Sequence, residues 1–227
     1  MINFFFFNFF FNYLHKVYES DSLEQIANFK CSKDWISDLK FSPDNKNLAI
    51  GCHDSAIYIY SVPDFKKKAG LRKHSSFITH IDWSDDSNFL HSNCGAFELL
   101  YWDIIGLKNI PNGATQFRNQ NWANWTCSLG WPVEGIYGTS TDGTEVCCVD
   151  RSHIKHPGGY NLVAVGDDFG KVRVLRYPSR NKGSEAVVGG GHTSSVTGVR
   201  WSVGDEWLYS AGGEDCCVFQ WKKIIKN

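Results

Sequence analysis

The chain has 227 residues, a formal net charge of −1, and aromatic residues at 15% of its composition, nine of them Trp. A chain of this length buries a sizeable core. The balanced charge excludes a global electrostatic attraction to nucleic acid or to an anionic membrane, so we expect neither as a partner. The aromatic content, together with the lack of any long stretch with a 3.6-residue apolar period, favours a β-rich protein.

Residues 1–12 form a low-complexity segment of Phe and Asn. Its apolar run, Ile2 to Phe11, is too short to span a bilayer, and it lacks the charge and cleavage pattern of a signal peptide. Three interpretations stay open: an aggregation-prone strand, an interfacial anchor, or spurious translation at the start of a clipped gene. The low complexity favours the last of these.

Four segments of the chain repeat one order of features: an alternating strand, a polar turn, a second strand, a Gly/Asp turn, and a third strand. We place the ends of the four third strands at Tyr60, Trp102, Leu175 and Trp221. Two of the three intervals lie near the about 40–45 residues of a WD-type propeller blade. The middle interval is longer, which predicts an insertion of about thirty residues between Pro111 and Val146.

The repeat predicts an all-β fold, a WD-repeat β-propeller of about four blades. The expected blades are residues 31–65, 74–118, 119–180 with the insertion, and 188–223, and residues 13–30 are expected to hold outer strands of a preceding blade. Residues 114–117 are a candidate fourth strand of the second of these blades. Four blades seldom close a ring alone, so we expect a partial or open propeller that belongs to a longer tandem.

In the last repeat, four polar and aromatic residues have the spacing of the hydrogen-bonded tetrad found in WD repeats: His192, Ser210, Asp215 and Trp221. Such a tetrad fastens the loop that enters a blade to the strands. The alternative is a hydrolase triad of His, Ser and Asp. Ser210 lies in mid-strand without a G-x-S-x-G elbow, so the structural interpretation is favoured and no enzyme activity is expected.

The second repeat retains only part of this tetrad pattern. His74, Ser92 and Trp102 are present, whereas Gly95 and Ala96 stand where the Asp is expected. We therefore expect the network of this blade to lack its carboxylate.

The eight cysteines contain no C-x-x-C motif and no Cys/His set with zinc-finger spacing. We expect reduced thiols, a cytoplasmic location, no metal site and no cofactor. The adjacent Cys216 and Cys217 are expected to begin the third strand of the last blade, with one thiol facing each neighbouring blade.

Two features are candidates for partner binding. One is a local basic cluster between the first two blades, made of Lys66, Lys67, Lys68, Arg72 and Lys73. It is either a solvated connection or a patch for an acidic polypeptide, such as the glutamate-rich tails of tubulin. The other is the insertion, in which Trp122 and Trp125 either cap the propeller edge or anchor a partner.

Beyond the repeat, several stretches are more specific. They include "LAIGCHDSAIYIYSV" (48–62), the W-T-C-x-L-G run at 125–130, "GDDFGKV" (166–172) and "GHTSSVTGVRWS" (191–202). In this order, over about residues 35–222, the chain resembles the echinoderm microtubule-associated protein-like family. The resemblance implies a non-catalytic, atypical tandem propeller that associates with tubulin or microtubules and locates to the cytoskeleton.

The chain departs from that family in two respects. Neither the family's HELP motif nor the N-terminal coiled coil of its shorter members is visible. The resemblance therefore falls on blades of a second propeller, and we expect this chain to be a C-terminal piece. The alternative function is a generic WD-repeat adaptor for a cytosolic or ciliary complex, without affinity for tubulin.

Overall fold

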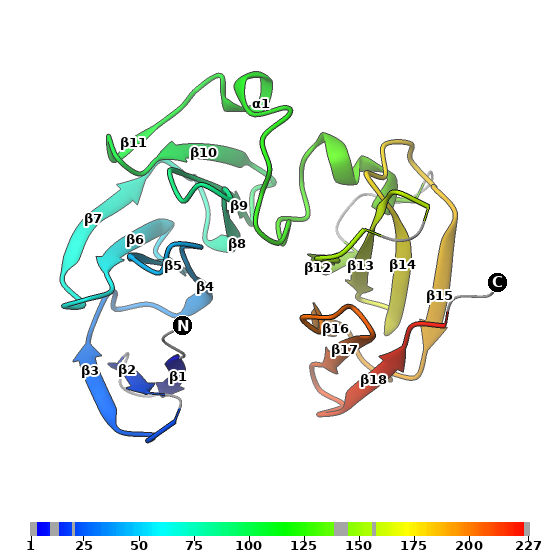
Figure 1. The fold of residues 1–227 in the computed structure, drawn as a ribbon, viewed down its shortest axis with the longest axis horizontal. Coiled ribbons are helices and arrows are strands. Elements are labelled where there is room, and N and C mark those ends of the chain that lie inside the picture. Colours follow the sequence, from blue (N-terminus) through cyan, green and yellow to red (C-terminus); the bar gives the residue numbers. More distant parts are fainter. Residues whose placement is uncertain (1–3, 10–13, 20, 139–144, 156–157, 225–227) are drawn as a thin grey trace. The chain divides into compact units, whose positions relative to one another are not determined.

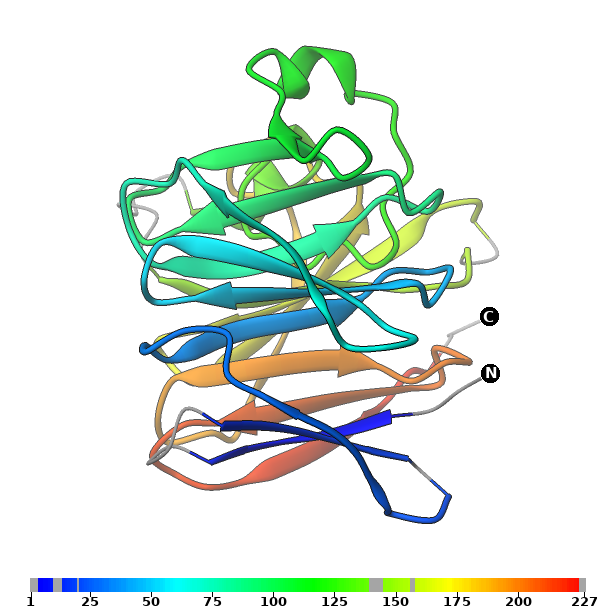
Figure 2. The same ribbon diagram turned by 90° about the vertical axis from the view of Figure 1, so that its left-hand side faces the viewer.

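The computed structural model describes residues 4–9, 14–19, 21–138, 145–155 and 158–224. The chain divides into two compact units, residues 1–123 and 124–227, each of which is built from antiparallel sheets (Figures 1 and 2).

The first unit holds three sheets, and in each the strands pair in chain order. One sheet is β1 (Phe4–Phe9), β2 (Leu14–Glu19) and β3 (Gln25–Phe29). The next is β4 (Ile36–Phe41), β5 (Asn47–Cys52), β6 (Ala56–Ser61) and β7 (Lys67–Arg72). The third is β8 (Ile78–Trp83), β9 (Phe89–Cys94), β10 (Leu99–Asp103) and β11 (Lys108–Asn109), followed by the short helix α1 (Gly113–Gln116).

The second unit holds two sheets with the same strand order. A 3₁₀ helix, η1 (Trp131–Ile136), precedes them. One sheet is β12 (Val146–Arg151), β13 (Asn161–Asp167), β14 (Lys171–Tyr177) and β15 (Ala186–Gly190). The other is β16 (Val196–Trp201), β17 (Trp207–Gly212) and β18 (Val218–Lys222). In the described part of the chain, no helix has the length and apolar character needed to cross a membrane.

A serine after the first strand fixes the first turn of four of these sheets. Each hydroxyl oxygen accepts the main-chain N–H of a residue near the start of the second strand, at 2.8–3.2 Å. The four serines are Ser42, Ser84, Ser152 and Ser202. Local side-chain bonds of this kind favour turns over continued strands. The same serine hydrogen bond therefore stabilises the first turn of all four sheets.

The register of the sheets confirms the repeat read from the sequence. The expected ends of the third strands occupy one position, since each pairs with the equivalent apolar residue of the second strand: Leu48↔Tyr60, Leu90↔Trp102, Val163↔Leu175 and Leu208↔Trp221. The first strand of each of these four sheets also carries a bulge at the same place, after its first residue. The described fold is all-β apart from α1 and η1, as predicted.

In the first unit, the β4–β7 sheet packs face to face on the β8–β11 sheet (Figures 1 and 2). The buried residues between them include Ala49, Ile57, Ile59, Ile78, Ile81, Trp83 and Leu90. Hydrogen bonds also cross this interface: among them, the Trp83 indole N–H donates to the Lys40 carbonyl at 3.0 Å, and the Ile81 N–H donates to Asp38 at 3.0 Å. Apolar burial and directional bonds together set how the two sheets meet.

The second unit repeats this interface between its own two sheets. The indole N–H of Trp201 donates to the Asp150 carbonyl at 3.2 Å, and the Trp201 main-chain N–H donates to the Asp150 carboxylate at 2.7 Å. Trp201 occupies the same register position in β16 as Trp83 does in β8. Val172, Val196 and Val199 are among the buried residues around it.

The predicted blade boundaries missed the outer strands. Strand β7 lies beyond the expected end at residue 65, and β15 lies beyond residue 180. Residues 114–117 are not the fourth strand of their blade: α1 occupies most of that stretch, and β11 is the fourth strand. An outer strand has one solvated edge and face, so it carries little of the alternating pattern by which inner strands are found.

The sheet interface of the first unit yields a matched pair of substitutions. Ile57 is fully buried between the two sheets, whereas Ile105 is 79% exposed in a turn. We expect Ile57→Ala to lower the free energy of unfolding by about 2–5 kcal/mol, because it deletes buried methyl groups and leaves a cavity. Ile105→Ala should change it by less than about 0.5 kcal/mol. Chemical denaturation of both variants checks this, and equal effects would contradict the described packing.

Candidate functional site

The structure brings together the four residues that the sequence placed in a tetrad. The His192 imidazole lies 2.8 Å from the Ser210 hydroxyl through Nε2 and 2.8 Å from Asp215 through Nδ1. The Trp221 indole N–H donates to the Ser210 oxygen at 2.8 Å. Ser210 is 1% exposed, so its hydroxyl is buried and already engaged by two partners. This geometry holds a loop to a sheet and does not present a nucleophile.

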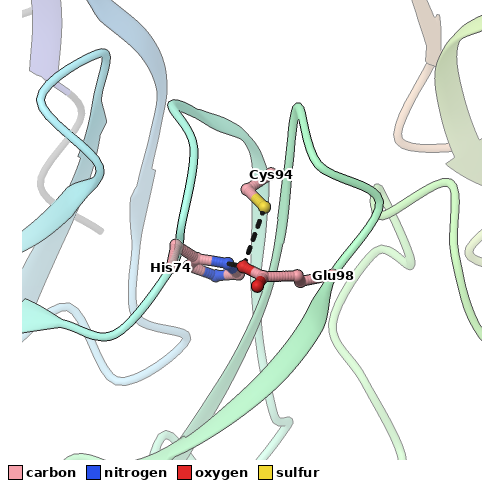
Figure 3. Close-up of side chains that lie close together, drawn as sticks. All are labelled: His74, Cys94 and Glu98. Atoms are coloured by element: carbon pink, nitrogen blue, oxygen red, sulfur yellow. Dashed lines mark hydrogen bonds and ion pairs between the residues drawn. The ribbon is translucent and has the colours of Figure 1, made fainter.

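A second network of the same kind lies in the first unit. His74 Nε2 is 2.7 Å from the Ser92 hydroxyl, and the Trp102 indole N–H donates to the same oxygen at 2.8 Å. The carboxylate comes from Glu98, whose Oε2 is 3.1 Å from His74 Nδ1 (Figure 3). The expectation that this blade lacks its carboxylate was therefore wrong.

The carboxylate was missed because it is shifted along the chain. Asp215 stands five residues after Ser210, whereas Glu98 stands six residues after Ser92. The additional methylene of Glu lets the carboxylate reach the imidazole from this displaced position. A search for a Glu six residues after the serine, in place of an Asp five residues after it, is the sequence signal that finds it.

Cys94 joins this second network, and no thiol takes the equivalent place in the other. Its thiol donates to Glu98 Oε2 at 3.1 Å (Figure 3). Counting from the serines, the equivalent residue in the second unit is Gly212, where an added Cβ would come within 1.9 Å of Asp215. The tetrad thus forms without a sulfur, and Cys94 is an addition to it.

The surroundings fix the protonation of these groups. The main-chain N–H of Ser75 and further donors lower the pKa of Glu98 to about 2. Burial lowers the pKa of His74 and raises the pKa of Cys94. At neutral pH the network therefore contains an ionised carboxylate, a neutral imidazole and a protonated thiol.

The basic cluster lies on an outer strand and not in a connection between blades. Residues 67–72 form β7, with Lys66 and Lys73 directly beside its two ends. Three of the five cations lie at the start of the strand and two at its end. Since a strand rises about 3.3 Å per residue, the two groups are separated by more than about 10 Å.

Each of the five cations has a local contact. Lys67 lies 4.1 Å from the centroid of the Tyr58 ring. Arg72 donates to the Tyr58 hydroxyl at 2.7 Å and to Asp54 at 3.1 Å. The other three each have one polar or acidic neighbour: Lys66 with Asp64, Lys68 with Asn47, and Lys73 with Asn109. Arg72 is thus part of the blade structure, while the Lys66 side chain is 82% exposed.

The two tryptophans of the insertion are buried. Trp122, in the first unit, is 1% exposed and stacks on His91 with ring centroids 3.9 Å apart. Trp125, in the second unit, is 3% exposed and has its ring 6.0 Å from that of Tyr177. Neither ring is available to anchor a partner, and both cover their own unit, in line with the capping alternative.

The adjacent cysteines near the C-terminus do not begin a strand. Strand β18 starts at Val218, and Cys216 has a φ of 51° in the turn before it. Both cysteines are exposed, so the prediction that they pack between blades was wrong. A left-handed residue ends strand alternation, and a Cys-Cys pair gives no signal of such a turn.

The Glu98 network makes stability depend on pH. The folded pKa of about 2 lies below the ordinary 4.5, so the ionised carboxylate stabilises the fold above pH 4.5, and this contribution is lost as pH falls towards 2. We expect Glu98→Gln to flatten the fall of the thermal midpoint across this window. Glu206→Gln, at an exposed position, should keep the parent slope. Parallel slopes for Glu98→Gln and the parent would contradict the assignment.

Known proteins resemble this chain over most of its length. Residues 14–223 match the model of the echinoderm microtubule-associated protein second beta-propeller. Among curated relatives, echinoderm microtubule-associated protein-like 3 of Mus musculus is 39% identical over 212 residues, which are 92% of this chain and 23% of that protein. Echinoderm microtubule-associated protein-like 1 of Homo sapiens is 39% identical over 212 residues, 92% of this chain and 25% of that protein.

A further relative is the ciliary WD repeat-containing protein ctxp80 of Euplotoides octocarinatus. It is 38% identical over 192 residues, which are 85% of this chain and 26% of that protein. The chain therefore spans about a quarter of the length of these relatives. The family match covers nearly all of the strands described above and confirms the predicted β-propeller class. This chain belongs to the echinoderm microtubule-associated protein-like family, and its sheets are blades of the family's second β-propeller.

Proposed function

We propose that this chain is a non-catalytic, tubulin-binding scaffold of the cytoskeleton, whose blades hold surface loops and outer strands in fixed positions. The observation that carries the proposal is the family match over residues 14–223, because relatives are named for microtubule association. The sheets supply the rigidity, since register, turns and interfaces repeat from blade to blade.

The chemistry of the described surfaces supports a binding role over a catalytic one. In the second unit, a groove of about 1280 Å³ is lined by strand residues such as Val174, Val187 and Trp221. Its lining includes no His or Cys and a single carboxylate, Glu185. The Ser184 hydroxyl in this lining donates to the Asn181 main-chain carbonyl, so it is hydrogen-bonded to the backbone and not to a general base.

The candidate contact to tubulin is the exposed part of the basic strand. Lys66, Lys68 and Lys73 extend from β7 and its flanks, and all three are exposed. Glutamate-rich tails are complementary in charge to such a strand. Arg72 and Lys67 lie against Tyr58 and are proposed as supports for the strand.

A second candidate function is an adaptor in a ciliary complex. One observation favours it, the similarity to a relative that is named as a ciliary WD repeat-containing protein. In this alternative the chain assembles other proteins and has no affinity for tubulin. Binding to purified tubulin distinguishes the two functions.

The test removes the exposed cations and leaves Arg72 and Lys67 in place. We expect Lys66→Ser, Lys68→Ser and Lys73→Ser together to weaken tubulin binding and to flatten its dependence on salt, because fewer charges are then screened. Co-sedimentation and binding at two salt concentrations measure both effects.

The matched control removes the same number of positive charges at positions away from β7. Lys155, Lys171 and Lys182 are exposed in the second unit, and their replacement by Ser should leave the affinity near that of the parent. Equal losses in the two triple variants would attribute the effect to net charge alone. Unchanged affinity of the first variant at low salt would exclude β7 as the contact, and no binding by the parent would favour the adaptor.

A further inference from the structure

Three side chains with metal-ligating atoms lie close together in the polar network around Ser92, in the first unit. They are His74, Cys94 and Glu98, and one ligand atom from each lies within 4.8 Å of the other two (Figure 3). His74 comes from the segment between β7 and β8, Cys94 ends β9, and Glu98 directly precedes β10. This set is not recognisable in the sequence, because its members stand twenty and four residues apart and match no zinc-finger spacing.

We propose that His74, Cys94 and Glu98 form a binding site for a thiophilic divalent cation of the zinc class. Imidazole nitrogen, thiolate sulfur and carboxylate oxygen are the three donor types that Zn²⁺ takes in proteins. A tetrahedral ion held by these three groups keeps a fourth position, for water or for the Ser75 hydroxyl. That hydroxyl donates to the other oxygen of Glu98 at 2.9 Å.

The ligand atoms are already close to the spacing that a single ion requires. His74 Nδ1 and Cys94 Sγ each lie 3.1 Å from the same oxygen of Glu98. Neighbouring ligands of a tetrahedral ion with bonds of about 2.0–2.3 Å are separated by somewhat more than 3 Å, so binding requires only small outward movements. The set is preorganised, because Cys94 ends β9 and its main-chain N–H donates to the Glu98 carbonyl at 3.3 Å, directly before β10.

Comparison of the two tetrads within the chain separates this site from an ordinary structural network. The second unit makes the same contacts to His192 with Asp215 and no sulfur. The first unit adds a thiol that the tetrad does not require. The metal ligand set is therefore a property of this blade and not of the repeat.

The surroundings provide both support and access. The Nε2 atom of His74 is 2.7 Å from the Ser92 hydroxyl, which orients the ring so that Nδ1 faces the carboxylate. The His74 side chain is 1% exposed, whereas that of Glu98 is 35% exposed. A cation reaches the site from the Glu98 side, while the imidazole and thiol lie beneath it.

Binding of the metal ion at this site releases one proton. The ion displaces the proton of the Cys94 thiol to solvent and forms a metal–sulfur bond. The imidazole stays neutral: its proton moves from Nδ1 to Nε2, where it donates to the Ser92 oxygen. Glu98 stays ionised, so the step is balanced without an oxidant or reductant.

The test uses Co²⁺ as the probe, because thiolate bound to cobalt gives a charge-transfer absorption and tetrahedral cobalt gives visible bands. The background chain carries Cys216→Ser and Cys217→Ser, which removes the two exposed thiols. We expect this chain to show both absorptions and Zn²⁺ to displace the cobalt. Cys94→Ser should abolish the charge-transfer band and weaken binding by at least the about 10–100-fold that loss of an outer-shell partner costs.

Matched controls address folding and specificity. Cys148→Ser removes a buried thiol of the second unit and should leave the cobalt spectrum unchanged. Zn²⁺ should raise the thermal midpoint of the background chain and not that of Cys94→Ser, whose midpoint without metal shows whether it folds. If Cys94→Ser unfolds, Glu98→Gln replaces it and should weaken cobalt binding. An unaltered charge-transfer band in the Cys94 variant, an unchanged cobalt affinity of the Glu98 variant, or no band in the background chain with cobalt in excess overturns the proposal.

Discussion

The arrangement of each unit depends on one bond, the indole N–H of a tryptophan that reaches across to the main chain of the neighbouring sheet. Trp83 makes it in the first unit and Trp201 in the second, and both stand at the same place in the first strand of their blade. A carboxylate accepts a second bond from a main-chain N–H at each interface, half-buried Asp38 in the first unit and buried Asp150 in the second. Apolar packing alone permits sliding between two flat faces, whereas buried donors require their acceptors and so fix the position.

Two of the blades are further organised by polar networks around a buried serine. The hydroxyl of Ser92 serves both an imidazole and an indole, and that of Ser210 does the same. The loop that enters the blade is thereby held to two strands at once. In the first unit, Cys94 joins such a network. The three proposed metal ligands are therefore already held in position by hydrogen bonds of the fold.

Much of this fold was predictable, and the failures share a physical origin. Strand alternation and turn residues located the repeat, so Tyr60 and Trp221 were assigned to equivalent positions that the register confirms. The outer strand β7 was missed because its single packed face leaves little apolar period. Glu98 was missed because contact depends on side-chain length as well as spacing. The burial of Trp122 follows from contacts with His91, 31 residues away in sequence, and no local pattern reports it.

The bonds between sheets also determine how far damage spreads. Each blade is a meander of consecutive strands, and its contacts across an interface are made with an adjacent blade of the same unit. Stability in such an array is a sum of blade terms and nearest-neighbour terms. Loss of the Trp83 indole bond therefore weakens the coupling between two blades while leaving the hairpins on either side intact. Within each unit, an error at one junction between blades therefore remains local.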